Sequence, residues 1–157
     1  MSPVRRLADA LFQVALTLWV GGLWSIGYLV VPTLFNTLES RPLAGAIAAS
    51  LFEVSGWAGL GLGIFLLLCL LLRQGLAALR TLPFWLAALM LILTAVSLFG
   101  IQPLMARMKL EALPLAVMES PLRERFSTWH GISSSLYLLQ SLLALGLLLR
   151  LGRSGGR

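Results

Sequence analysis

Four long runs without a charged side chain divide the sequence. They cover residues 10–38, 54–72, 81–106 and 126–149, and are 29, 19, 26 and 24 residues long. A helix needs about 18 to 20 apolar residues to cross the hydrocarbon of a bilayer. Each run is long enough, so the pattern predicts an all-α fold: an integral membrane four-helix bundle with antiparallel, up-down helices.

Prolines and polar residues suggest where these helices begin, bend and end. The first helix is expected over residues 9–34, and Pro32 should bend it or end it because proline removes a backbone hydrogen bond. Pro42 suits the first turn of a second helix of about 30 residues, longer than a bilayer core. The third helix should begin near Pro83 and be disturbed at Pro103, and the last should run from Trp129 to Arg150.

Nearly all of the chain is needed for four crossings and their connectors. We therefore expect one transmembrane domain over residues 1–150, followed by a disordered basic tail over residues 151–157. The apolar stretch after Arg5 and Arg6 is too long for a secretory signal and has no small-x-small cleavage site, so it reads as a retained first helix. The single cysteine, Cys69, excludes an internal disulfide.

Positive charge is unevenly divided between the two ends of such a bundle. The chain has twelve Lys and Arg against six Asp and Glu. The end with both termini and the link near residues 73–80 would carry seven basic residues and one acid, and the other end five of each. Because Lys and Arg stay on the cytoplasmic side during insertion, we expect cytoplasmic termini in a bacterial inner membrane. Topology thus explains the net charge of +6 without nucleic acid.

Four polar side chains are predicted to share one depth. Tyr28, Glu53, Gln102 and His130 each lie 19 or 20 residues from the inner end of their own helix. At 1.5 Å per residue this is about 29–30 Å, near the outer boundary of the hydrocarbon. Ionisable groups at membrane depth are functional candidates, so we expect Glu53 and His130 to meet inside the bundle near its outer rim. The alternative is that both only reach interfacial water or pair with nearby arginines.

The last helix carries a polar face. His130, Ser134, Tyr137 and Gln140 follow one another at spacings of three and four residues, which places them on one side of a helix. Such groups commonly form hydrogen bonds with neighbouring helices. The alternative is a hydrated pocket that descends from His130 toward Gln140. The candidate binding residues are Tyr28, Glu53, Gln102, Arg107, Trp129, His130, Ser134 and Tyr137.

A metal site is a second hypothesis. Met105 and Met108 lie three residues apart and, with His130, would offer the soft ligands that select Cu(I). Copper or haem handling through His130, Glu53, Met105 and Met108 is therefore an alternative function, although the chain has one histidine. We find no phosphate loop, paired metal-binding histidines or serine nucleophile elbow, so an enzyme is not expected.

Small residues recur on the first two helices. Gly59 and Gly63 follow Ser55 at four-residue spacing, and Gly21 and Gly22 stand between two tryptophans. This spacing lets helix backbones approach closely in lipid. It also suits contact with a planar ligand, or a homo-oligomer or membrane-protein interface, and a structural subunit of a complex is a third hypothesis.

At these residues the sequence resembles bacterial four-span membrane proteins classed as a domain of unknown function. The resemblance covers about residues 12–142 and is carried by the segments 19–24 (WVGGLW), 31–35 (VPTLF), 44–45, 51–52, 102–103, 125–126, 129–131 (WHG) and 133–134, with Tyr137 and Gln140. These proteins are similar to eukaryotic transmembrane protein 205 and, more distantly, to the copper resistance protein D family. The resemblance implies the fold and the membrane location, and no settled activity.

Overall fold

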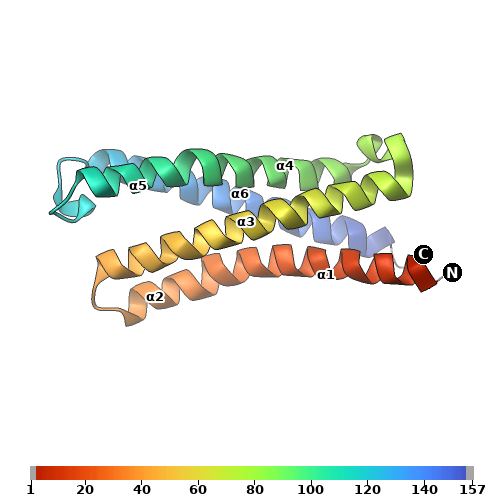
Figure 1. Cartoon of the computed structure of the whole chain (residues 1–157), viewed down its shortest axis with the longest axis horizontal. Coiled ribbons are helices and arrows are strands. Elements are labelled where there is room, and N and C mark those ends of the chain that lie inside the picture. The colour runs from red at the N-terminus through yellow and green to blue at the C-terminus, as the bar shows by residue number, and fades with distance from the viewer. Residues whose placement is uncertain (1–2, 155–157) are drawn as a thin grey trace.

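The computed structural model describes residues 3–154, and helices account for nearly all of them (Figure 1). None of these residues forms a strand. In chain order the elements are α1 (Pro3–Ser25), the π-helix η1 (Ile26–Val30), α2 (Val31–Thr37), α3 (Arg41–Gln74), the 3₁₀-helix η2 (Gly75–Arg80), α4 (Leu82–Val96), the π-helix η3 (Ser97–Ile101), α5 (Gln102–Glu111), the 3₁₀-helix η4 (Val117–Glu119) and α6 (Arg123–Ser154).

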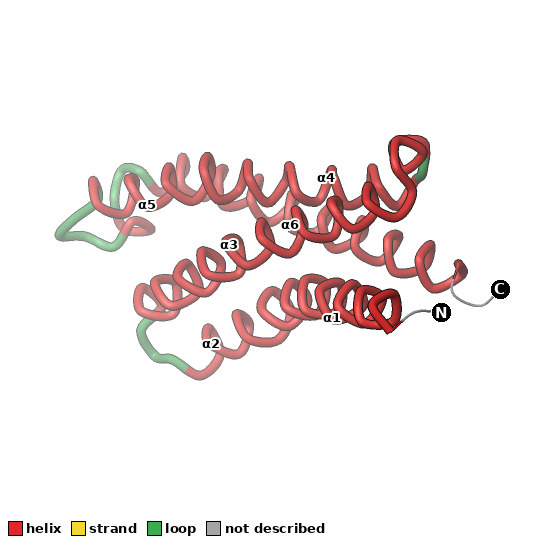
Figure 2. The backbone as a smooth tube through the Cα atoms, turned by 45° about the vertical axis from the view of Figure 1, so that its right-hand side comes forward, coloured by secondary structure: helices red, strands yellow, loops and turns green. Residues whose placement is uncertain are grey.

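These elements join into four rods that are long and apolar enough to cross a membrane. The rods are Arg5–Thr37, Arg41–Arg80, Leu82–Glu111 and Arg123–Gly152. Loops occur only at the ends of the rods (Figure 2). The prediction of an all-helical protein with four candidate membrane spans is therefore confirmed.

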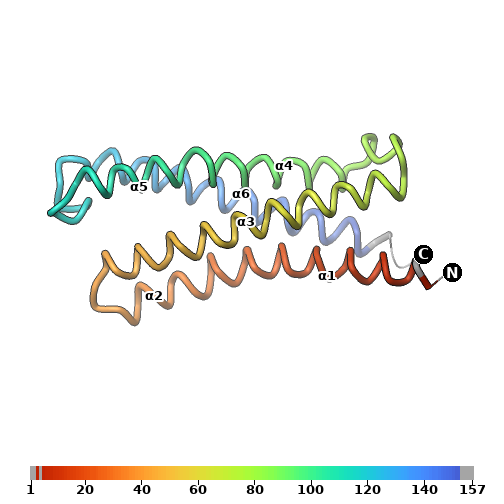
Figure 3. Tube along the Cα trace, viewed as in Figure 1, coloured from red at the N-terminus to blue at the C-terminus, as the bar shows by residue number. Residues whose placement is uncertain are grey.

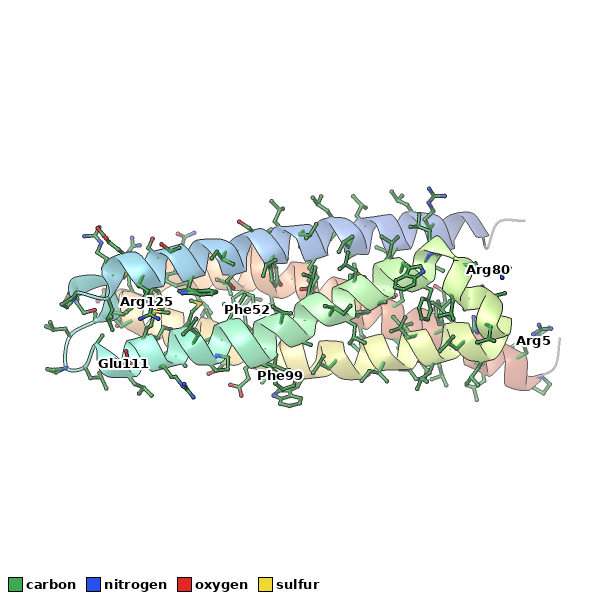
Figure 4. All side chains as sticks on the ribbon, turned by 90° about the horizontal axis from the view of Figure 1, so that it is seen from above. Arg5, Phe52, Arg80, Phe99, Glu111 and Arg125 are labelled. Carbon is green, nitrogen blue, oxygen red and sulfur yellow. The ribbon has the colours of Figure 1, made fainter. Side chains whose placement is uncertain are left out.

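The two ends of the bundle differ in what they carry. Figure 3 shows the start of α1 and the end of α6 at the same end as η2, and the α2–α3 and α5–α6 connectors at the other. In Figure 4, Arg5 and Arg80 lie at the first end, and Glu111 and Arg125 at the second. We refer to these as the inner end and the outer end.

The first and last helices differ from the sequence prediction at both ends, and the first runs from Pro3 to Thr37 rather than over residues 9–34. α6 begins at Arg123, six residues before the expected Trp129, so the helix extends beyond the uncharged run that starts at residue 126. α6 also continues to Ser154, beyond the expected boundary at residue 150, and residues 155–157 lie outside the described residues. The second helix begins at Arg41, next to Pro42, as predicted.

Both π-helices precede a proline in the same way. Pro32 follows the last residue of η1 by two positions, and Pro103 follows the last residue of η3 by two positions. Proline lacks an N–H, and its ring clashes with the carbonyl four residues earlier. One wider turn with i to i+5 bonds accommodates this change without ending the helix. The disturbances predicted at Pro32 and Pro103 are thus local widenings within continuous rods.

The core of the inner half is apolar and closely packed. Leu66 of α3, Met90 of α4 and Leu147 of α6 are almost completely enclosed. Trp19 of α1 lies against Gly59 and Gly63 of α3, where an added Cβ would be 2.9 Å from Trp19 Nε1 and 2.8 Å from Trp19 Cη2, respectively. The glycine spacing on the second helix therefore serves close packing against an aromatic ring.

A charged contact fastens α1 to the end of α3 at the inner end. The Arg73 guanidinium pairs with Asp9 at 2.9 Å and donates a hydrogen bond to the Ala8 carbonyl at 2.9 Å. Its Cζ also lies 4.7 Å from the centre of the Phe12 ring. Both charged side chains are partly exposed, so the ion pair contributes only about 0–1 kcal/mol, and the contact mainly fixes where α1 begins to pack.

Gly27 is predicted to be intolerant of a side chain. A Cβ at this position would overlap the Tyr137 ring of α6. We expect Gly27→Ala to lower the free energy of unfolding by about 1–3 kcal/mol, the usual cost of overpacking. SDS titration of the purified protein, followed by circular dichroism, measures this change. Gly21→Ala is the matched control because its Cβ meets no atom within 4 Å. Equal stability of the two variants would contradict the prediction.

Candidate functional site

A cavity of about 260 Å³ lies among all four rods. α1 and η1 line it with side chains between Leu18 and Ile26, and α3 lines it between Leu51 and Leu62. The remaining walls come from Thr94, Ser97 and Gln102 of the third rod and from Tyr137 and Gln140 of α6. The volume approaches the lower end of the range typical of small-molecule sites, about 300–1,000 Å³.

One wall of the cavity is polar and internally bonded. The Gln140 amide, 7% exposed, donates to the Thr94 hydroxyl at 2.7 Å. Thr94 in turn donates to the Met90 carbonyl of its own helix at 2.9 Å. The Gln102 amide donates to the Ser97 hydroxyl at 3.5 Å, which is a long and weak contact. The third rod and α6 therefore offer amide and hydroxyl groups to the interior.

The facing wall is aromatic. The Trp19 side chain is 4% exposed and lines the cavity while it lies against the two glycines of α3. Within the described residues its indole N–H forms no hydrogen bond. Every fully enclosed side-chain nitrogen or oxygen among these residues has a partner, so the indole nitrogen must border open space. The cavity thus contains a donor that is not in use.

Tyr137 borders the cavity on the side of the outer end. Its hydroxyl donates to the Leu23 carbonyl, which lies just before η1, where the hydrogen-bond pattern of the helix changes. Its ring packs edge-on against Phe52 at 5.3 Å and Tyr28 at 6.2 Å between ring centres. The Tyr28 hydroxyl donates to Ser141 at 2.9 Å. Three rods are therefore joined at this level.

The cavity has no charge and lies within the apolar length of the rods. None of its lining residues within the described part of the chain is acidic, basic or a histidine. At 1.5 Å per residue, Gly22 lies about 20 Å from Asp9, and Gln140 lies about 15 Å from Arg150. A hydrocarbon core is about 30 Å thick. If the inner charges mark one boundary, the cavity is near the middle of the membrane.

The cavity also reaches the lipid-facing surface. Leu18 of α1 and Val54 of α3 line it, yet they are 60% and 68% exposed. Ala58 of α3 also lines it and is exposed. These residues mark the seam between α1 and α3, so the cavity is accessible from the position that lipid chains would occupy.

The structure does not bring the predicted Glu53 and His130 together. Both side chains are exposed, and within the described residues Glu53 has neither a hydrogen bond nor an ion pair. The His130 ring stacks on Phe126 of its own helix, at 6.2 Å and 8°. The expected meeting inside the bundle is therefore wrong, because each residue projects from the outside of its helix.

The other predicted binding residues divide into two groups. Gln102 and Tyr137 line the cavity, and Tyr28 packs against Tyr137 from outside it. Arg107 and Ser134 are exposed, Trp129 is half-buried, and none of these three lines the cavity. The polar face of α6 is thus interior only in its lower part, where Gln140 and Ser141 are buried. A binding role for the exposed residues stays a prediction.

The proposed metal ligands also differ in their exposure. Met108 is buried, Met105 is half-buried and His130 is exposed. The described residues contain no group of three or more His, Cys, Asp or Glu side chains that could hold a metal ion. Copper or haem handling stays a prediction that no contact in the structure favours.

Sequence reasoning missed most of the residues that line the cavity. Trp19, Thr94 and Ser97 were not among the predicted site residues, although the sequence places Trp19 beside Gly21 and Gly22. One available signal was the small-residue spacing of Gly59 and Gly63, which marks the face of α3 that a flat ring can approach. A second signal was the pair of hydroxyl residues Thr94 and Ser97, which stand before Pro103 in an otherwise apolar run.

Comparison with known proteins identifies a family. A family model described as a domain of unknown function, DUF4149, matches residues 14–114, which is more than half of the chain. No curated protein and no solved structure matches the chain. The predicted resemblance to a family of unknown function is confirmed. Relationships with transmembrane protein 205 and the copper resistance protein D family stay predictions.

The bond between Gln140 and Thr94 should contribute to stability. We expect Thr94→Val, which keeps the shape but removes the acceptor, to lower the free energy of unfolding by about 0.6–1.7 kcal/mol, the range for hydrogen bonds between membrane helices. SDS titration measures the change. Ser135→Ala is the control, since Ser135 is exposed and bonds only to the Gly131 carbonyl of its own helix at 3.0 Å. An unchanged midpoint for Thr94→Val would refute the expectation.

Proposed function

We propose that this chain, which belongs to the DUF4149 family of domains of unknown function, is a membrane protein that binds a small uncharged molecule within its helical bundle. The binding site is the cavity among the four rods. Under this proposal the protein binds its ligand without covalent catalysis, because the lining contains no nucleophile paired with a base.

The observation that carries the proposal is an uncharged cavity with convergent polar groups within the apolar length of the rods. Sites for small molecules are mostly apolar, with a few placed polar groups that fix orientation. Here Trp19 and the aliphatic residues of α1 and α3 supply the apolar surface, and Gln102 and Gln140 supply amides. A charged ligand would lose its hydration without gaining an opposite charge, so the site favours neutral molecules.

The proposal includes a location and an orientation. The excess of Lys and Arg at the inner end supports insertion with both termini in the cytoplasm of a bacterial inner membrane. Glu53 and His130 would then lie at the outer surface of the bilayer, where contact with headgroups and water lowers the free-energy cost of a charged side chain. In this arrangement they are candidates for contact with a partner and are separate from the cavity.

Filling the cavity should weaken binding strongly. A Cβ at Gly22 meets no atom within 4 Å, and Gly22 lines the cavity, so Gly22→Leu places its side chain in open space. Benzophenone is a suitable neutral probe because it labels nearby C–H bonds under ultraviolet light. We expect saturable labelling of peptides from residues 18–26 or 51–62 to fall about tenfold or more in Gly22→Leu, since forcing atoms into occupied space costs about 1–3 kcal/mol.

Two controls accompany this experiment. Gly21→Leu adds the same side chain to the same helix at an exposed position outside the cavity, and it should label like the wild type. Benzophenone-4-carboxylate should not give saturable labelling, because its charge has no partner in the site. Equal labelling of Gly22→Leu and Gly21→Leu would contradict the proposed function.

The orientation can be tested separately. With Cys69 replaced by Ala, single cysteines are introduced at Gln74 in the inner link and at Ser50 of α3. Both positions are exposed. In intact cells stripped of their outer membrane, we expect a membrane-impermeant maleimide to label Ser50→Cys and to leave Gln74→Cys unlabelled until the cells are lysed. The reverse pattern would overturn the orientation.

A further inference from the structure

Trp19 holds a hydrogen-bond donor that the described part of the chain does not use. Its ring packs closely on α3, where an added Cβ at Gly59 or Gly63 would lie within 3.0 Å of it. Its side chain is almost completely buried and lines the cavity, and its nitrogen is not fully enclosed although it has no hydrogen-bond partner within the described residues. Close packing therefore restricts the directions in which the indole N–H can point.

Three hydroxyl groups of the cavity wall already use their protons on backbone carbonyls. Ser55 donates to Phe52 at 3.1 Å, Thr94 donates to Met90, and Tyr137 donates to Leu23. These oxygens can offer only lone pairs to a ligand. The indole N–H differs from them because it can donate and can never accept.

An unpaired N–H is costly where no water can replace the missing partner. A molecule that brings an oxygen acceptor to Trp19 removes this cost, whereas a hydrocarbon of the same shape leaves it in place. The chemistry of the wall therefore distinguishes between ligands that are equally apolar.

The route to the donor is also set by the structure. Leu18 and Val54 are both exposed on the lipid-facing side and line the cavity, so the seam between α1 and α3 leads from the hydrocarbon to Trp19. Aliphatic side chains border this seam. A molecule that uses it must already be dissolved in the bilayer.

We infer that the cavity selects lipid-dissolved, uncharged molecules that carry a carbonyl oxygen, such as ketones, esters or quinones, and that the Trp19 indole N–H donates a hydrogen bond to this oxygen. The inference rests on the proposed function, since it names the ligand class of the same cavity. Trp19 here acts as a specificity residue.

A matched pair of probes tests this inference. Benzophenone and 1,1-diphenylethene have nearly the same shape, but the second has a CH₂ group in place of the carbonyl oxygen. The full-length protein in mild detergent is photolabelled with a trace of tritiated benzophenone, and each unlabelled compound is added as a competitor. We expect benzophenone to compete about fivefold more strongly than 1,1-diphenylethene, as one neutral hydrogen bond implies.

Variants then assign this preference to one residue. Trp19→Phe keeps an aromatic ring but removes the donor, and it should bring the two compounds to equal potency, with 1,1-diphenylethene unchanged within about twofold. Trp57→Phe is the control because Trp57 is exposed on α3 and does not line the cavity. It should keep the wild-type preference.

The outcomes separate this inference from the proposed function. If both compounds compete equally in the wild type, or if Trp19→Phe keeps the fivefold preference, the inference is wrong while the binding cavity stands. If neither compound competes for labelling of the cavity peptides, the proposed function itself fails. The wild-type comparison needs no variant, so poor folding of Trp19→Phe would leave the test intact.

Discussion

Hydrocarbon offers no hydrogen-bond partner, and this constraint organises the interior of the bundle. Every polar group within the membrane must be satisfied by the protein or be costly. The bundle meets this requirement through bonds such as Gln140 to Thr94 and Tyr137 to the Leu23 carbonyl. Against this background the indole N–H of Trp19 stands out, because it is closely packed, nearly enclosed and unbonded within the described residues.

The prolines shape the same region without breaking the rods. Each π-helix widens its rod by one residue ahead of Pro32 or Pro103, and each contributes a residue to the cavity, Ile26 from η1 and Ser97 from η3. π-helical turns are frequent at functional sites because they alter which side chains face inward. The cavity thus lies where two rods deviate from regular α-helical geometry.

The sequence was sufficient to predict four helices, because each uncharged run is long and its ends are marked by charge. It was not sufficient to predict which side of each helix faces inward. Lipid is as apolar as a protein core, so hydrophobicity does not distinguish the two sides. The depth of Glu53 and His130 could therefore be estimated, while their outward direction could not. Gly59 and Gly63 were better guides, since close packing requires small residues on the inner face.

The two hairpins of the chain share one pattern: a helix, a π-helix, a proline and a returning helix. At equal distances before their prolines, Leu23 corresponds to Thr94 and Ile26 to Ser97, and all four line the cavity. At these corresponding positions the first hairpin has the aliphatic Leu23 and Ile26 and the second has the hydroxyl residues Thr94 and Ser97, so the two halves of the cavity wall differ in chemistry. An amphipathic ligand bound between these two halves consequently has one energetically preferred orientation.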